Sequence, residues 1–420
     1  MLPGRIRFCQ LTTFYPPQSF GGDAMFVYRL ANSLAARGHE VDVIHCADSY
    51  KLLARGPLPA PLPHHPGVTV HTLHSRLGAL SPLLTQQTGR PWLKTGKIRR
   101  VLESRKFDVL HYHNVSLLGP KALEIYPGHD HYVRLYTAHE HWLICPMHVL
   151  WKDGRRTCDT PRCLRCTLRS RRPPQWWRYT KLLQESSEFV DQFISPSRFS
   201  IDMHSLHGFH KPFVQLPCFS PAPDANAHRQ DVNGRPYFLF AGRLEKIKGL
   251  HTLIPVFAQY PQADLLIAGR GDYEAELRRL ASGAHNISFL GWLPPGRLAA
   301  LYRNAISIIV PSVCCEVFSM VLLEAFSNRT PAIVSASGAL PEIIRDCQGG
   351  FIFTNEAELL SAMEQLQTSP DLRRQLGDNA YGKWEQNWSE DAHLRMYLDI
   401  LSQTAQRKWG FVPWAAPRAK

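Results

Sequence analysis

The chain has 420 residues, which is too long for one ordinary hydrophobic core and suits two domains of about 200 residues each. Its composition is that of a globular protein, and no apolar run approaches the ~18 residues of a spanning helix, so we expect neither a signal peptide nor a membrane anchor, and a cytoplasmic location. The formal net charge of +13 favours anionic partners, such as nucleotide phosphates, phospholipid headgroups or nucleic acid, without choosing among them.

Short apolar runs alternate with segments of helical period along the whole chain, a pattern typical of parallel α/β sheets. The clearest helical segment, residues 24–37, repeats Phe26, Leu30 and Leu34 on one face. Ligands of such sheets bind beyond the carboxyl ends of the strands, so the loops that follow strands carry the functional information. In the first half we predict strands at residues 6–11, 40–45, 68–73, 108–111, 132–137 and 190–195.

The first of these loops contains Gly21 and Gly22 and opens the helix at 24–37. Two residues without side chains allow the backbone to approach a bound diphosphate. The loop lacks the Gly-x-Gly-x-x-Gly spacing of dinucleotide-binding folds, which disfavours a nicotinamide cofactor. A later loop, after the strand at 132–137, contains His139, for which a structural role is the default among 20 histidines.

Four of the ten cysteines cluster in an insert at about residues 140–175, and the last two have the Cys-x2-Cys spacing of a zinc knuckle. In a reducing cytosol, thiolate ligands of a structural zinc ion are favoured over disulfides. Free thiols remain a third alternative. The four residues are Cys145, Cys158, Cys163 and Cys166.

The segment at residues 169–181 combines basic side chains with Trp176, Trp177 and Tyr179. Such a combination suits the interface of an anionic membrane. The alternative is a basic loop whose tryptophans pack into the core. The membrane interpretation would place the protein at the inner face of the cytoplasmic membrane and suggests a lipid-linked acceptor.

A polar, proline-rich stretch at residues 217–236 is the predicted linker. Beyond it we predict strands at residues 237–241, 264–268, 287–290, 307–310, 332–335 and 350–353. We predict helices at residues 250–259, 273–280, 297–303, 320–326 and 356–367, and the tail at 389–407 again has helical period. The sequence therefore predicts two doubly wound, Rossmann-like sheets.

The loop after the strand at 237–241 holds Arg243 and Lys248, the residue types that bind a diphosphate as a fork and as a point charge. A basic turn at a strand end is an equally weighted alternative for this loop alone. Glycines in this loop and the next would let a ligand lie close to the backbone; they are Gly242, Gly249, Gly269 and Gly271.

Two carboxylates, Glu316 and Glu324, stand eight positions apart around an apolar segment after the strand at 307–310. A helix beginning near Ser319 leaves Glu316 in the preceding loop and places Glu324 inside the helix, while the helix N-terminus suits a phosphate. Because the neighbours of Glu324 are apolar, an unpaired carboxylate there would be costly, which favours a ligand over a solvated helix residue.

The order of these motifs, GRLxxxKG, Pro311-Ser312, the Glu-x7-Glu pair and SGALPEII, resembles glycosyltransferase family 4 over nearly the whole chain. The resemblance implies the GT-B fold, in which two Rossmann-like domains face each other across a cleft, and a retaining, metal-independent transfer from a nucleotide sugar. The chain departs from the family at Ser319, where members often have a glycine in the turn before the helix.

The resemblance implies roles for single residues. Arg243 and Lys248 would neutralise the donor diphosphate, Glu324 would bind the ribose and Glu316 the transferred sugar. The backbone at Phe318, Ser319 and Met320 would lie near sugar and phosphate, and His139 would lie at the reacting centre.

The predicted domains are an acceptor-binding half at 1–217, a donor-binding half at 218–388, and a helix and tail at 389–420 that packs back on the first half. The expected partners are a nucleoside-diphosphate sugar, a glycan or lipid-linked acceptor in cell-surface polysaccharide or glycolipid synthesis, and an anionic membrane. Nucleic acid is not expected, because no motif supports it. A nucleotide-sugar 2-epimerase and a non-catalytic scaffold stay open as alternatives.

Overall fold

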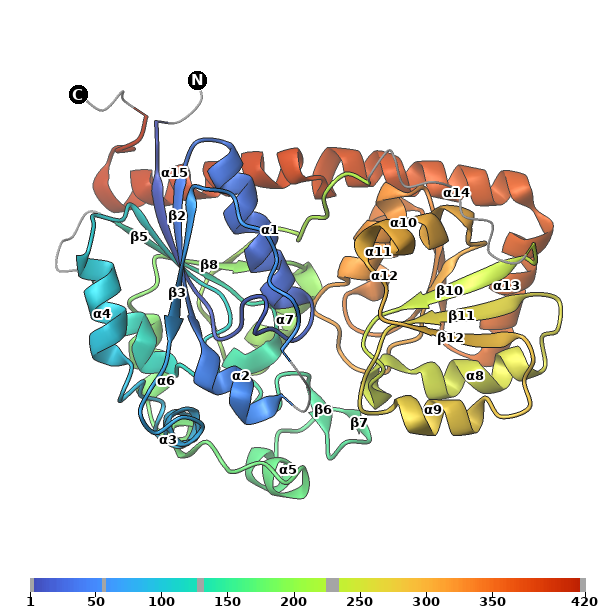
Figure 1. Cartoon of the computed structure of the whole chain (residues 1–420), viewed down its shortest axis with the longest axis horizontal. Helices are drawn as coiled ribbons and strands as arrows, with labels where there is room; N and C mark the ends of the chain where they lie inside the picture. The colour runs from blue at the N-terminus through green and yellow to red at the C-terminus, as the bar shows by residue number, and fades with distance from the viewer. Residues whose placement is uncertain (1–3, 55–57, 127–131, 224–233, 416–420) are drawn as a thin grey trace.

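The computed structural model describes residues 4–54, 58–126, 132–223 and 234–415, and it contains two parallel β-sheets side by side (Figure 1). The first sheet has the strand order β3-β2-β1-β4-β5-β8-β9. Its predicted strands are confirmed with end shifts of at most two residues, and the short β9 is an addition. The strands are β1 (Arg7–Leu11), β2 (Glu40–Cys46), β3 (Val68–Leu73), β4 (Val109–Tyr112), β5 (Val133–Thr137), β8 (Gln192–Ser195) and β9 (Phe213–Gln215).

The helix that follows β1 forms as the apolar period predicts, because Phe26, Leu30 and Leu34 are all buried against the sheet. An antiparallel pair, β6 (Trp151–Lys152) and β7 (Arg156–Thr157), lies in the insert and was not predicted. The helices of this half are α1 (Gly22–Ala36), α2 (Ala47–Leu53), α3 (Leu80–Thr88), α4 (Thr95–Glu103), α5 (Cys163–Arg169), α6 (Leu182–Ser187) and α7 (Arg198–Leu206).

The second sheet has the order β12-β11-β10-β13-β14-β15, in which the chain turns from one side of β10 to the other. This reversal creates the crevice where doubly wound sheets bind ligands. All six strands were predicted: β10 (Tyr237–Ala241), β11 (Asp264–Ala268), β12 (Ile287–Gly291), β13 (Ile308–Val310), β14 (Ala332–Ser335) and β15 (Gly350–Phe353).

The helices of the second half include two that were not predicted, α12 and α14. In both, a proline occupies one of the first two helical positions, Pro341 and Pro370, where its missing N–H costs nothing. The helices are α8 (Leu250–Ala258), α9 (Glu274–Leu280), α10 (Pro295–Asn304), α11 (Met320–Ser327), α12 (Leu340–Cys347), α13 (Glu356–Thr368) and α14 (Pro370–Lys383).

The long C-terminal helix α15 (Glu390–Trp409) lies along the first sheet, as the red helix at the top of Figure 1 shows. Tyr397 Oη lies 3.0 Å from Nδ1 of His111 on β4, and Lys408 Nζ pairs with Asp191 at 2.7 Å. Buried side chains such as Phe219 and Trp388 join both halves in one apolar cluster. The chain therefore crosses twice between its halves.

The domain boundaries stay predictions, and parts of the predicted linker and tail, 224–233 and 416–420, lie outside the described residues. Among the described residues, no helix combines the length and the apolar character that crossing a membrane requires.

Candidate functional site

The loops at the carboxyl ends of β10, β11, β13 and β14 pack directly on one another. A Cβ atom on Gly249 would lie 1.8 Å from the carbonyl oxygen of Pro311, and one on Gly338 would lie 2.3 Å from the backbone nitrogen of Glu316. Gly269 and Gly271 abut the backbone of the loop at 242–244 in the same way. These glycines therefore serve loop-to-loop packing, which fixes the side chains of the site.

Substitution of Gly249 tests this packing. Because Gly249 has φ +77° and no room for a Cβ, we expect Gly249→Ala to lower the free energy of unfolding by about 3 kcal/mol or more. Gly283 is the matched control, since it has φ +88° with nothing within 4 Å, and its alanine variant should lose only about 1 kcal/mol. Urea unfolding of both variants measures the difference, and equal losses would contradict the role of Gly249.

Lys248 and Glu316 form a partly buried ion pair at the centre of these loops. Lys248 Nζ donates to Glu316 Oε1 at 2.6 Å, and the hydroxyl of Ser312 donates to the same oxygen at 2.6 Å. Burial alone raises the pKa of Glu316, but the Lys248 ammonium and the hydrogen bonds more than offset this, so its pKa lies below the ordinary value. Burial lowers the pKa of Lys248, but the Glu316 charge, the nearby Cys314 and the hydrogen bond to Glu316 together outweigh it, so its pKa is raised. Both groups are therefore charged at neutral pH.

Arg243 lies at the mouth of the site, half exposed, with its Nη1 2.6 Å from Glu245 Oε1. The glycine loop before α1 meets it from the other half: a Cβ on Gly21 would lie 3.4 Å from Arg243 Nε, and one on Gly22 would lie 3.3 Å from the Met320 side chain. The structure thus brings together the predicted diphosphate ligands of both halves.

The helix after Glu316 begins at Met320, as predicted, with Ser319 as its N-cap residue. The Ser319 side chain makes no capping hydrogen bond, so the first backbone N–H groups of α11 are not satisfied by it. An N-terminus of this kind has a positive dipole end and suits a phosphate. Phe318 and Ser319 lie in the loop that leads into it.

Glu324 has partners within the protein, so the cost of an unpaired carboxylate does not by itself call for a ligand. Its Oε1 accepts from Arg29 Nη2 at 2.7 Å, and its Oε2 lies 3.4 Å from Tyr302 Oη. Arg29 lies on α1, 295 positions earlier in the chain, so no local sequence pattern could have predicted this ion pair. Glu324 is nonetheless 25% exposed, so its carboxylate is not sealed from a ligand.

His139 is partly buried and belongs to a group of aromatic rings at the carboxyl end of the first sheet. Its Nε2 lies 3.0 Å from Nδ1 of His113, and its ring packs 4.8 Å from Phe26 between centroids. Burial, and secondarily the proximity of His393, lowers the pKa of His139 to about 3. At neutral pH His139 is therefore an uncharged imidazole that donates at one nitrogen and accepts at the other.

Asp23 is a site residue that the sequence analysis missed. It lies in the first turn of α1 and accepts from Asn114 Nδ2 at 3.0 Å. Burial, followed by the charge of Glu140, raises its pKa, while Arg243 lowers it. Asp23 therefore lies within electrostatic reach of Glu140 and of Arg243. Its place directly after Gly22 is the signal that could have found it.

The Glu316 loop is also held by the first half of the chain. His141 Nε2 lies 3.2 Å from the carbonyl oxygen of Cys315, and the hydroxyl of Ser197 donates to the carbonyl oxygen of Val317 at 2.7 Å. Glu342 on α12 accepts from the backbone N–H groups of Arg198 and Phe199, each at 2.8 Å. Glu342 thus caps α7, while the backbone N–H of Ala339 donates to the carbonyl oxygen of Glu316 at 2.8 Å.

None of the four clustered cysteines forms a disulfide, and the backbone N–H of Asp153 donates to Cys166 Sγ at 3.3 Å. Burial raises the pKa of Cys158 to about 11, which leaves its thiol protonated. In the described part of the chain, no three histidine, cysteine or acidic side chains are arranged to hold a metal ion. The arrangement does not present a ready tetrahedral site, and zinc binding stays a prediction.

The aromatic residues of the basic segment divide between core and surface. Trp177 is buried, and its indole donates to the carbonyl oxygen of Gln86 at 2.9 Å, so its predicted contact with a membrane is wrong. Trp176 and Tyr179 are 56% and 61% exposed.

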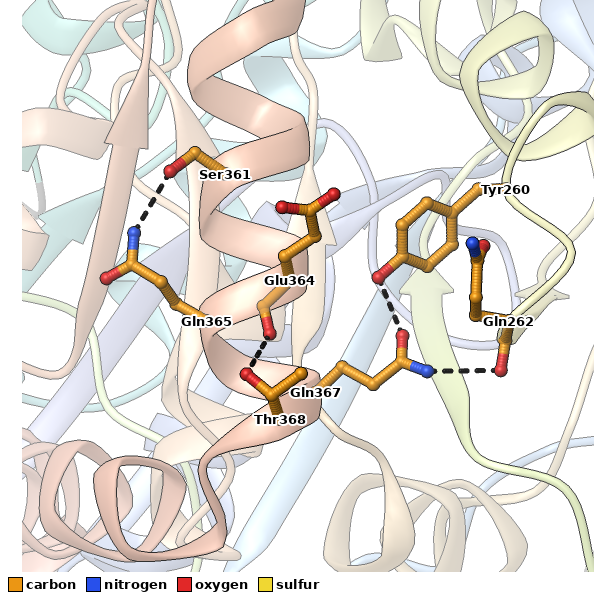
Figure 2. A pocket seen from close by; sticks show the side chains of 7 residues that line it. All are labelled: Tyr260, Gln262, Ser361, Glu364, Gln365, Gln367 and Thr368. Atoms are coloured by element: carbon orange, nitrogen blue, oxygen red, sulfur yellow. Dashed lines mark hydrogen bonds between the residues drawn. The ribbon is translucent and has the colours of Figure 1, made fainter.

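A separate pocket is lined by Tyr260, Gln262 and side chains of α13 (Figure 2). Tyr260 Oη donates to Gln367 Oε1 at 2.7 Å, and Gln367 Nε2 donates to the carbonyl oxygen of Gln262 at 3.1 Å (Figure 2). Gln262 lies two residues before the first residue of β11, so this pocket lies at the amino ends of the strands. Ligands of doubly wound sheets bind at the carboxyl ends, so we do not assign the reaction to it.

Two sequence-family models match the chain in succession. "Glycosyltransferase Family 4" matches residues 20–220, and "Glycosyl transferases group 1" matches residues 224–383. A sucrose-phosphate synthase from Thermosynechococcus elongatus superposes with a TM-score of 0.72 at 21% identity, covering 94% of this chain and 98% of its own. The Anabaena protein HepE in complex with UDP gives 0.65 at 17% identity over 95% and 100%.

Among curated relatives, a D-inositol 3-phosphate glycosyltransferase of Pseudarthrobacter chlorophenolicus is 26% identical over 94% of both chains. An O-antigen chain mannosyltransferase of Escherichia coli is 28% identical over an aligned region that covers 43% of this chain and 50% of that relative. The fold is therefore GT-B, with two Rossmann-like units. The chain belongs to glycosyltransferase family 4 and is a glycosyltransferase.

Proposed function

We propose that this protein transfers a sugar from a nucleoside-diphosphate donor to a glycan or lipid-linked acceptor, with retention of the anomeric configuration, in the synthesis of a cell-surface polysaccharide or glycolipid. The observation that carries the proposal is the Lys248–Glu316 pair beside Arg243, with the N-terminus of α11 and the Gly21 loop completing the site. Two cations and a helix N-terminus suit a diphosphate, and a carboxylate beside them suits sugar hydroxyls.

In this proposal Arg243 and Lys248 bind the two phosphates, and the backbone at Phe318, Ser319 and Met320 completes the anion site. Glu316 accepts hydrogen bonds from the hydroxyls of the transferred sugar. When the donor enters, Lys248 shares its ammonium between Glu316 and the phosphate, because a lysine has three N–H donors and Glu316 uses one.

The reaction forms a bond between the acceptor oxygen and the anomeric carbon of the sugar, on the face that the diphosphate leaves. The bond between that carbon and the diphosphate oxygen breaks, and the acceptor proton passes to the departing phosphate. The protein contributes by stabilising the charge that develops on the diphosphate, through groups already in place. His139, a neutral imidazole, hydrogen-bonds a hydroxyl of the donor sugar or of the acceptor.

The proposed acceptor side includes peripheral contact with an anionic membrane at the inner face of the cytoplasmic membrane. Trp176 and Tyr179 are exposed beside basic residues of the same segment, and aromatic and basic side chains together favour a lipid–water interface. Sedimentation with phosphatidylglycerol vesicles tests this contact: a Trp176→Ser/Tyr179→Ser variant should bind less, and unchanged binding would contradict it.

Incubation with UDP-, GDP- and ADP-sugars, without an acceptor and then with a lipid-linked oligosaccharide extract, tests the activity. We expect release of one nucleoside diphosphate, faster with acceptor, and a product of retained configuration by NMR. Formation of an epimeric sugar without acceptor would instead show the 2-epimerase. Absence of any release would favour the scaffold. The transferase names of the relatives described above favour transfer.

A further inference from the structure

The Arg29–Glu324 pair joins the two halves of the chain at the proposed nucleotide site. Arg29 lies on α1, about two helical turns after the glycine loop, and Glu324 lies in the second turn of α11. The starts of these helices also meet, since Gly22 lies against Met320. The first half therefore contacts the donor half at the phosphate end and again at Glu324.

The carboxylate of Glu324 is held from two sides. Arg29 donates to Oε1 at 2.7 Å, and the phenol of Tyr302 lies 3.4 Å from Oε2. Burial, together with the charge of Glu324, raises the pKa of Tyr302 well above its ordinary value, so the phenol keeps its proton and acts as the donor. The two donors fix the orientation of the carboxylate.

Glu324 nevertheless keeps acceptor capacity. A carboxylate offers about four lone-pair sites, of which these two donors use two. Arg29 and Glu324 are 19% and 25% exposed, so a ligand reaches the pair without dismantling it. Glu324 lies four residues into α11, or about 6 Å along the axis from its start, a separation that fits the distance between a phosphate and a ribose in one nucleotide.

We infer that Arg29 is a positioning residue for ribose recognition: it orients the Glu324 carboxylate toward the 2′,3′-diol and makes the first half of the chain part of the nucleotide site. This inference rests on the proposed function and deepens it. Without Arg29, Glu324 keeps only the longer contact to Tyr302 and turns more freely, so it distinguishes ribose from deoxyribose less well.

The test measures dissociation constants by calorimetry for UDP, GDP and ADP and for their 2′-deoxy counterparts dUDP, dGDP and dADP, using the nucleotide that binds. In the wild type we expect loss of the 2′-hydroxyl to weaken binding about tenfold, because a hydrogen bond to a charged acceptor is lost. In Arg29→Gln the same loss should weaken binding only about twofold, with Arg29→Lys in between.

The matched control is Arg37→Gln, because Arg37 is the C-cap residue of the same helix and pairs with Glu390 at 2.7 Å and with Asp391, on α15 and away from the nucleotide site. It should keep the full tenfold preference. In the transfer assay, Arg29→Gln should raise KM for the donor with little change in kcat, because ribose is bound alike in the ground and transition states.

The variant Glu324→Gln separates the two claims. Should it lose the ribose preference while Arg29→Gln retains it, the role of Arg29 is overturned and the donor site stands. Should Glu324→Gln keep the full preference, the ribose assignment itself is wrong, and the inference fails with it. Circular dichroism of each variant verifies the fold.

Discussion

Replacement of Lys248 with alanine is expected to lower turnover about 100- to 1,000-fold, because removal of one preorganised contact to developing charge raises the barrier by about 3–4 kcal/mol. Glu316 holds the Lys248 ammonium in place at 2.6 Å, so the free energy of reorganisation is small when the diphosphate departs. In this variant the partly buried Glu316 carboxylate keeps the Ser312 hydroxyl as a hydrogen-bond donor but loses the ammonium.

The control is Lys246→Ala. Lys246 lies two positions away in the same 3-10 helix, Lys246–Lys248, and its side chain is exposed. It removes the same charge from the same loop without touching Glu316, so its turnover should stay near that of the wild type. Near-wild-type turnover of Lys248→Ala, or an equal loss in both variants, would contradict the assignment of Lys248.

Acidification is expected to unfold the protein well above the pKa of its carboxylates, because buried histidines must gain protons. Burial is the largest cause that lowers the pKa of each of seven histidines: to about 3 for His139 and His141, to about 4 for His45, His204 and His393, and well below the ordinary value for His111 and His113.

The sign of the effect follows from linkage. Below about pH 6.5 the unfolded chain binds protons at these rings and the folded chain does not, so stability falls as the pH falls from about 6.5 toward the folded-state pKa values. Each ring removes about 1 kcal/mol between pH 7 and 5.5, and together they approach the total stability of about 5–15 kcal/mol of a typical protein.

Urea unfolding between pH 7.5 and 5 measures this dependence. His393→Phe should flatten the slope by up to about 1.4 kcal/mol per pH unit, the value for one proton. His285→Asn, at an exposed position, is the control and should leave the slope unchanged. A stability that is level across this range would show that the rings are accessible to protons in the folded state.

The strands and most helices were predictable because each is a local pattern: β10 and β11 are apolar runs, and α1 repeats its apolar face every three or four residues. The helix α12 was not predicted, although Pro341 is a helix-start signal. The two-residue strands β6 and β7 carry too little pattern to be recognised.

The candidate site was predictable where it depends on residue type after a strand, as with Arg243, Lys248 and Glu316. It was not predictable where it depends on pairing between distant segments. The partner of Glu324 is Arg29, and the burial of Trp177 but not of Trp176 is decided by the packing of Trp177 against the end of α3 at Gln86. Such contacts exist only once the two sheets have been assembled.

The central claim is that the crevice at the carboxyl ends of β10 and β13 binds a nucleoside diphosphate. Thermal unfolding of the wild type and of Lys248→Ala with UDP, GDP and ADP tests it most directly, since a ligand at 100 times its dissociation constant stabilises a protein by about 2.7 kcal/mol. We predict a rise in melting temperature with one of the three nucleotides that the variant largely loses. A wild-type protein that none of them stabilises, or a rise that Lys248→Ala retains in full, would contradict the claim.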